Sequence, residues 1–465
     1  MKARLLGLWE SLRSSFWFVP TLMALAAVAL SAGTVALDSG TVGKKLANSV
    51  GWLWSGGADG ARSLLSTVAS SMITVAGTVF SITITALVLA SGQFGPRLLR
   101  NFTRDTGNQV VLGTFVATFL YCLLVLRTVR GAQEGDFVPY LSVTFGMALA
   151  VASIGVLIYF IHHVAGSIQA ESLIAAVGTE LKGDIARLFP PAPPGPGDDA
   201  PDPPGTVPEG RAPLPVHAAE SGYVLGIDRD GLVAAAEEGD LLIQALRRPG
   251  DFVSCGDTLL QVWPQRDGFG EDQAKRLRGA FSLGARRTPT QDVRYGVRQL
   301  TEIAARALSP GINDPFTAMG CTDWLADALA EMARRPAPSG VRRGAEGRPR
   351  LLEEPVGFAE LARLSFEPIR AYGADSAMVI AHLLHALARL AGQADRPEHR
   401  AALLHEAELA AATARQALGT EADLQRVQDG LDQVRAAPVQ AESAQDVSGS
   451  ATSHGVPAPA PPTRA

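Results

Sequence analysis

The chain has 465 residues, of which 47% are hydrophobic and 19% are charged, and its formal net charge is −5. This length leaves room for two or three domains, and the slightly acidic balance argues against nucleic acid as a partner. The cysteines Cys122, Cys255 and Cys321 are far apart and form no CxxC pair, which argues against a disulfide framework and against a thiolate metal site.

Four long apolar stretches lie in the first 165 residues. They predict transmembrane helices over about residues 16–37, 64–90, 110–129 and 139–161, because a helix of about 20 apolar residues crosses the hydrocarbon core of a bilayer. The first stretch is too long for the hydrophobic region of a signal peptide, and three more follow it, so we interpret it as an anchor. We therefore expect a multi-pass protein with the lipid bilayer as its partner.

The orientation in the membrane depends on the positive charges in the short loops. One side holds Lys2, Arg4, Arg13, Arg97, Arg100 and Arg104, and the other holds Lys44, Lys45, Arg62, Arg127 and Arg130. Since this difference is small, the region after residue 165 decides the orientation: it is long, has free cysteines and carries no export feature of its own. We expect both termini in the cytoplasm and the protein in the inner cell membrane.

The second apolar stretch carries a row of hydroxyl side chains. The row consists of Thr67, Ser70, Ser71, Thr74, Thr78, Ser81 and Thr85. Separations of three, four and seven residues place them on one side of a helix, with Gly77 beside them. Two interpretations are open: tight packing of helices through small residues, or the lining of a polar pathway between helices, including those of an oligomer. No charged residue lies in this stretch, which argues against a proton relay there.

The middle of the chain is predicted to hold a helix, a linker and a small β module. A juxtamembrane helix is expected over residues 166–189, and the prolines of residues 190–215 indicate an extended linker. Residues 216–265 alternate short β-type runs with turns, and they resemble the barrel-sandwich modules of biotinyl and lipoyl carriers. The segment lacks the lysine that carries the cofactor in those modules, so the resemblance implies architecture without carrier chemistry. The predicted core of the module holds Phe252, Val253, Leu259 and Val262.

The segment ARRTPTQDVRYGVRQLTEIAARALSPGINDPFTAM (285–319) predicts two capped helices that are joined by a short turn. Thr288 can cap the first helix, with a proline at its first position and Gln291 closing a capping box. Gly311 can take a positive φ and end that helix. Asp314 can cap the second helix, which also begins with a proline.

This segment also holds candidates for a ligand or subunit contact. They are Arg287, Gln291, Asp292, Ser309, Asn313 and Asp314. A capped helix start presents free N–H groups and a partial positive charge, which favour an anion. Three interpretations stay open: a purely structural turn, a ligand or subunit contact, and a catalytic role. No nucleophile, base and orienting group come together in the sequence, so we assign no catalytic residue.

The remaining chain predicts an α-helical cytoplasmic domain over residues 270–436 and a disordered tail over 437–465. Asp375 can cap one of its helices, and a stripe near its end can pack within the domain or between subunits. The stripe consists of Leu424, Val427, Leu431 and Val434. His382 and His385 lie three apart without a further ligand, so we predict no metal site and no cofactor.

Three motifs carry a resemblance to a known family. They are QFGPRLL (93–99), AFSLGARRTPTQDVRYGVRQLTEIAARALSPGINDPFTAM (280–319) and EPIRAYGADSAMVIAHLLHAL (367–387). Over about residues 5–430 the chain resembles the bacterial predicted membrane proteins named "domain of unknown function 2254". The resemblance implies an N-terminal membrane part and a cytoplasmic part, and it supplies no activity or site residues.

The sequence thus predicts a mainly α protein with four transmembrane helices, a small β module and an α-helical cytoplasmic domain. Our first hypothesis is a non-enzymatic, homo-oligomeric membrane protein, whose cytoplasmic domain assembles or senses and whose membrane part is channel-like or transport-related. The second is a structural scaffold of the cell envelope, and the third is a membrane-bound enzyme. The lack of a phosphate loop, a G-x-S-x-G motif or a metal cluster in the sequence weighs against the third.

Overall fold

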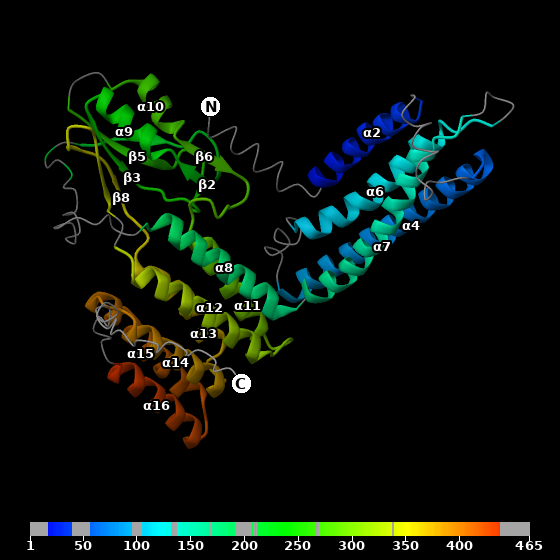
Figure 1. Ribbon diagram of the computed structural model, residues 1–465. Helices are drawn as coiled ribbons and strands as arrows, with labels where there is room; N and C mark the ends of the chain where they lie inside the picture. Colours follow the sequence, from blue (N-terminus) through cyan, green and yellow to red (C-terminus); the bar gives the residue numbers. More distant parts are fainter. Residues whose placement is uncertain are drawn as a thin grey trace, which may run out of the picture.

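The computed structural model has two arms, which join near residue 169 (Figure 1). It describes residues 17–39, 56–94, 105–131, 137–167, 169–190, 207, 210, 212–265, 269–336 and 339–437. The predicted tail, most of the proline-rich linker and most of the loop cations that bear on orientation lie outside these residues.

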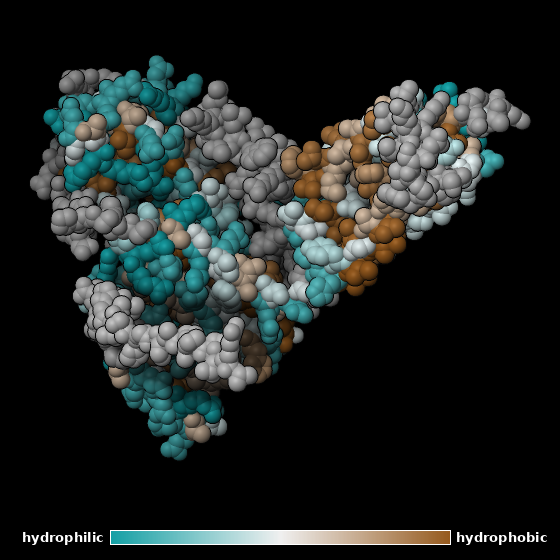
Figure 2. All heavy atoms as spheres, viewed as in Figure 1, coloured by the Kyte–Doolittle hydropathy of each residue, from teal (hydrophilic) through white to brown (hydrophobic). Residues whose placement is uncertain are grey.

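One arm consists of four helices that are long and apolar enough to cross a membrane, as the sequence predicted. They are α2 (Phe18–Ser39), α4 (Ala58–Phe94), α6 (Thr106–Leu126) and α7 (Tyr140–Ser167). Among the coloured residues of Figure 2, brown apolar ones are prominent on this arm, whereas teal hydrophilic ones prevail on the second arm. Helix α4 begins at Ala58, earlier than the predicted residue 64, because the helix continues beyond the apolar stretch that reveals it in the sequence.

Helix α6 is the centre of the membrane arm. It contacts α2, α4 and α7, and its residues Phe115, Tyr121 and Cys122 are at most 1% exposed. Helix α4 packs inward through small residues, such as Ala61 and Ala76. Alanine lets the two helix backbones approach closely, which is how helices associate where lipid surrounds them.

The second arm contains a bundle of seven helices. They are α8 (Ala170–Leu188), α11 (Arg294–Ala307), α12 (Pro315–Ala333), α13 (Phe358–Tyr372), α14 (Ala377–Gly392), α15 (Pro397–Ala417) and α16 (Glu421–Ala436). One apolar core joins them all, so the predicted juxtamembrane helix α8 belongs to the bundle. The stripe on α16 packs within the domain: Val427 and Leu431 are buried, and Gly430 lies against Leu384 of α14.

The β module stands beside this bundle and contains eight strands and two short helices among the described residues. Its elements are β1 (Leu214–His217), β2 (Gly222–Ile227), α9 (Arg229–Glu238), β3 (Leu241–Ala245), β4 (Phe252–Val253), β5 (Thr258–Pro264), α10 (Glu271–Arg278), β6 (Phe281–Gly284), β7 (Val341–Arg343) and β8 (Pro349–Glu353). One sheet has the order β1-β5-β3-β8-β7 and the other β4-β2-β6. Of the strand pairs among the described residues, only β3 and β8 are parallel.

The module extends beyond the boundary at residue 265 that the sequence indicated. Strands β7 and β8 come from the connection between α12 and α13, and β8 adds to β3 with Ile243 opposite Leu351. The sequence-based division into a β module and a separate helical domain is therefore too simple, because this pairing joins strands that are distant in the chain. The predicted core residues Val253, Leu259 and Val262 are buried, whereas Phe252 is 55% exposed and stacks edge-on against Tyr223.

Candidate functional site

The hydroxyl row of α4 lies on an exposed face of the helix among the described residues. Thr67, Ser70, Ser71, Thr74, Thr78, Ser81 and Thr85 are all exposed. They lie opposite the alanine-rich face that packs on α6. Ile73, Phe80 and Ile82 lie on the flanks of the row, where their side chains are 46%, 38% and 44% exposed.

The threonines of the row satisfy their own hydroxyl groups. Thr67, Thr74, Thr78 and Thr85 each donate to the carbonyl oxygen four residues earlier, at 2.8, 2.8, 3.1 and 2.9 Å. This internal bond lets a threonine reside in a helix within lipid. A Cβ added at Gly77 would meet nothing within 4 Å, so the same face is open there too. The row is therefore a weakly polar surface of small side chains that the described helices leave uncovered.

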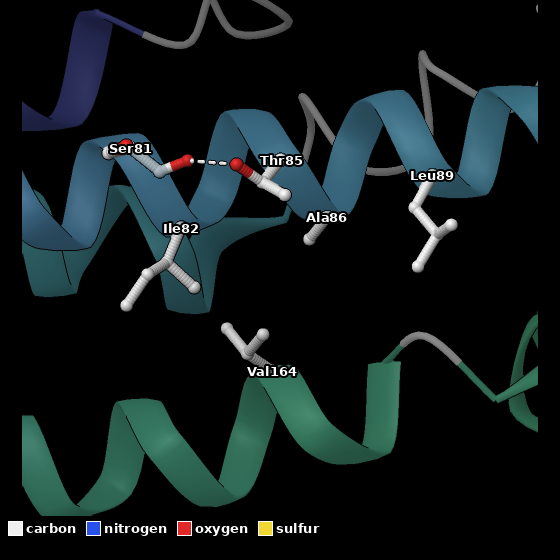
Figure 3. A pocket seen from close by; sticks show the side chains of 6 residues that line it. All are labelled: Ser81, Ile82, Thr85, Ala86, Leu89 and Val164. Carbon is white, nitrogen blue, oxygen red and sulfur yellow. Dashed lines mark hydrogen bonds between the residues drawn. The ribbon is translucent and has the colours of Figure 1, made fainter.

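A hollow of about 240 Å³ lies at the end of the row, between α4 and α7. It is lined by Ser81, Ile82, Thr85, Ala86, Leu89 and Val164, and most of its wall is apolar. Figure 3 shows Ile82, Ala86 and Leu89 directed toward Val164, while Ser81 and Thr85 lie along one edge. Among the described residues, the end of the hydroxyl row thus borders an apolar groove.

Helix α7 is held at both ends by aspartates. At its start, Asp38 from the end of α2 accepts hydrogen bonds from the backbone N–H groups of Leu141 and Ser142, at 3.0 and 2.9 Å, and from the Ser142 hydroxyl. At its other end, His163 Nε2 lies 2.6 Å from Oδ2 of Asp105. Asp105 also accepts from the N–H of Gly107 and so caps α6. The sequence analysis did not single out either aspartate, because each partner comes from a distant helix.

The six candidate polar residues fall into two groups at opposite ends of α11. Arg287, Gln291 and Asp292 precede the helix, and Ser309, Asn313 and Asp314 follow it. Helix α11 has 14 residues, and at 1.5 Å per residue it separates the two groups by about 20 Å. The structure does not bring the six residues together into one site.

The first group belongs to an ionic cluster at the contact between the β module and the bundle. Asp292, which is 2% exposed, receives a hydrogen bond of 2.6 Å from Nη2 of Arg287 and one of 3.3 Å from Nε of Arg294. Arg294 is 5% exposed, and its Nη2 donates to the Pro249 carbonyl at 2.7 Å and to Asp251 at 2.8 Å. These contacts fix the loop before β4 to the start of α11.

The electrostatics of this cluster favour the charged arginine. Burial lowers the pKa of Arg294, but its hydrogen bond to Asp251 and the charges of Asp292, Asp251 and Glu360 outweigh that effect, so the pKa is raised. Glu360 also binds Arg248 at 2.9 Å. The arginines and carboxylates thus pair with one another, which makes the cluster a structural joint.

Gln291 closes no capping box, contrary to the prediction from the sequence. Helix α11 begins at Arg294 with Val293 as its N-cap, beyond Thr288 and its proline. The side chain of Gln291 instead accepts from the N–H of Ile227 at 2.9 Å and donates to the carbonyl of Ile227 at 3.3 Å. It serves the end of β2, a partner that the local sequence cannot reveal.

The second group builds the turn between α11 and α12. Asp314 caps α12 as predicted, accepting from the N–H and the hydroxyl of Thr317 at 3.1 and 2.6 Å. The Ser309 hydroxyl donates to the Arg306 carbonyl at 2.6 Å. The residue with positive φ is Asn313, at 51°, and not Gly311. Asparagine tolerates this conformation better than most other residues.

The two histidines of α14 have different surroundings. His382 Nε2 lies 3.1 Å from Asp323 of α12, which also receives a bond of 2.8 Å from Arg389. His385 is exposed. Within the described parts of the chain, no group of three His, Cys, Asp or Glu side chains is placed to hold a metal ion.

Two buried polar side chains lie at about the same level on α13 and α15. Phe358 stacks on His399 at 4.2 Å and Arg370 donates to Thr413 at 3.1 Å, so the two helices run parallel. Ser365, which lies between these contacts, comes level with Glu406. The residues are 0% and 4% exposed, and among the described residues Ser365 Oγ and Glu406 Oε2 have no hydrogen-bond partner.

The comparisons with known proteins extend over most of the chain. Uncharacterized proteins of Mycobacterium bovis and of two strains of Mycobacterium tuberculosis are each 33% identical to it over 431 residues, which is 89% of this chain and 79% of each relative. No solved structure matches the chain. Residues 13–389 match the family described as predicted membrane protein, DUF2254. The chain is therefore a member of the DUF2254 family of predicted membrane proteins.

Proposed function

We propose that this protein is a non-enzymatic homo-oligomer of the inner cell membrane, with both termini in the cytoplasm, in which the hydroxyl faces of α4 from several copies line a polar pathway. The soluble arm assembles the copies or senses a ligand, and it acts on this pathway. The observation that carries the proposal is the exposure of seven hydroxyl side chains on the face of α4 opposite its own core.

The chemistry of this face fits a pathway better than contact with lipid alone. A helix face that only meets acyl chains gains nothing from a row of serines and threonines, whereas a lumen or a neighbouring helix can use each of them. The row has no charge, so it would pass small polar or ionic species without holding them tightly.

The second arm, which contains the bundle and the β module, directly contacts helix α4. Helix α11 contacts α4, and the ionic cluster at the start of α11 joins it to the β module. A shift of α11 would therefore reach the helix that carries the hydroxyl row. The paired charges of the cluster support a role in transmission rather than in catalysis.

Thiol accessibility tests the proposal in full-length protein in liposomes. Thr74→Cys, Thr78→Cys and Ser81→Cys are made in a Cys255→Ser background, because Cys255 is exposed and Cys122 and Cys321 are buried. We expect a membrane-impermeant thiol reagent to modify all three. The matched control is Ile84→Cys, which is exposed on the same helix outside the row and should stay inert.

The result also separates the pathway from the scaffold hypothesis. Inert thiols that nevertheless form disulfides between copies would indicate packing in a scaffold and would refute the pathway. Inert thiols without any cross-link would refute both the pathway and the oligomer. Ion flux in the same liposomes, reduced by modification of Thr78→Cys, is the expected functional result.

A further inference from the structure

Four exposed apolar side chains gather at one end of the helical bundle. Ile312 lies in the turn between α11 and α12, and Phe316 lies in the first turn of α12; they are 44% and 71% exposed. Tyr372 and Met378 flank the turn between α13 and α14, at 59% and 38%. Soluble surfaces rarely group large apolar side chains in this way without a partner.

The two turns form a single tip. A Cβ added at Gly373, in the second turn, would lie 3.3 Å from Cδ1 of Leu308, which is the C-cap of α11. The four side chains therefore share one end of the bundle, which we name the bundle tip: Ile312, Phe316, Tyr372 and Met378.

The register of α8 and α12 places this tip beside the membrane arm. The helices run parallel, with Lys182 paired to Asp327 at 2.7 Å and Ile174 near Gly320. One turn earlier, Phe316 comes level with Ala170, the first residue of α8. Helix α7 ends at Ser167, three residues before Ala170, so Phe316 lies level with the end of α7. Figure 1 shows α8 and α12 side by side where α8 follows α7.

The turn that holds Ile312 and leads into α12, where Phe316 lies, is stabilised by its own backbone hydrogen bonds. The N–H groups of Ile312 and Asn313 donate to the carbonyl of Ser309 at 3.0 and 2.9 Å, and the N–H of Asp314 donates to Ala307 at 2.8 Å. These bonds satisfy backbone groups inside the turn. The apolar side chains can thus enter a less polar medium without stripping these groups of their partners.

We propose that the bundle tip inserts into the interfacial region of the leaflet from which α7 emerges. Aromatic side chains such as Tyr372 prefer this region, and a protruding Phe316 gains by leaving water there. The charged residues of the two turns and of the last turn of α11 are Arg306, Asp314 and Asp375, which give no positive surplus. The tip therefore binds through apolar insertion and does not require anionic lipid. The partner is the bilayer that the same chain spans.

Depth measurements with a spin label test this directly. Full-length protein with Cys255→Ser carries Phe316→Cys, labelled and reconstituted in phosphatidylcholine vesicles. Two reference sites use the same label: Val88→Cys on α4, which is 67% exposed on the membrane arm, and Ala401→Cys, which is exposed near the start of α15. Because Phe358 at the start of α13 stacks on His399, this second site lies at the end of the bundle opposite the tip. Collisions with oxygen report the bilayer, and collisions with a water-soluble nickel chelate report the aqueous phase.

We expect the label at position 316 to collide at least about threefold less with nickel than the label at 401, with oxygen access close to that at 88, and no change when phosphatidylserine is added. Equal nickel access at 316 and 401 would overturn the proposal. So would low access to both reagents together with spin–spin broadening, because this result would mean that a second copy covers the tip.

Discussion

Gly178 of α8 and Trp324 of α12 are in direct contact: a Cβ added at position 178 would lie 2.6 Å from Cδ2 of the indole ring. This is closer than real Cβ contacts come. Because α8 follows α7 almost directly, the contact between the glycine and the ring helps to hold the bundle against the end of the membrane arm.

Gly178→Ala should therefore destabilise the protein. Overpacking of this kind costs about 1–3 kcal/mol, which we expect to see as a lower midpoint of thermal unfolding of the detergent-purified chain. The control is Gly183→Ala on the same helix, where a Cβ meets nothing within 4 Å. It should be neutral or gain up to about 1 kcal/mol from helix propensity. Equal effects of both changes would show that the indole ring moves aside.

Asp38→Ala should destabilise the end of the membrane arm that is distant from the bundle. The change removes the acceptor for two backbone N–H groups and one hydroxyl at the start of α7. Loss of such a cap costs about 1–2 kcal/mol, measured as the free energy of unfolding in detergent. Asp59→Ala, at an exposed position in the first turn of α4, is the control and should cost less than about 1 kcal/mol. If the two variants unfold alike, Asp38 contributes no more than a surface charge does.

Arg294→Met should separate the β module from the bundle. The variant leaves Asp292, whose side chain is 1% exposed, without one of its two arginines, and it removes the bond to Pro249. Breaking a buried ion pair from one side costs about 3–5 kcal/mol, and limited proteolysis should then cut near Asp251. Arg342→Met, which removes a 46% exposed partner of Glu353, should cost at most about 1 kcal/mol. An intact, protease-resistant Arg294→Met protein would contradict the role of the cluster as a joint.

Glu406 should make the stability of the bundle depend on pH. Burial raises the pKa of this carboxyl, and Arg370 offsets the rise only in part. The folded state then binds a proton that the unfolded state has released, so the free energy of unfolding falls as the pH rises from the unfolded pKa of about 4.3 through the higher folded pKa. Glu406→Gln should flatten this dependence and raise the unfolding midpoint at neutral pH.

The control for this pH effect lies two residues further along α15. Glu408 is exposed and pairs with Arg435 at 3.2 Å. Glu408→Gln should keep the pH dependence of the original chain and change stability by less than about 1 kcal/mol. A pH profile that is the same in the original protein and in Glu406→Gln would rule out the buried carboxyl as its source.

Local signals in the sequence were sufficient for several elements. Uncharged stretches of about 20 residues predicted the four candidate spans, because lipid demands a helix with its backbone groups satisfied internally. Asp314 before a proline predicted the start of α12, and the structure shows it as the cap. The prediction of Asp375 as a helix cap was wrong by one residue, since Ser376 caps α14.

The sequence by itself determined the division into an apolar arm and a polar arm, the succession of helices, and the row of hydroxyls on one side of α4, because each depends on residues within a few turns of one another. Only the tertiary structure decided that this row faces outward, that β8 joins β3, that Gln291 serves β2, and that Phe316 lies level with the end of α7. Each of these depends on contacts between segments far apart in the chain. The residue pattern of a helix or strand predicts which of its faces is buried, but it does not predict which other element packs against that face.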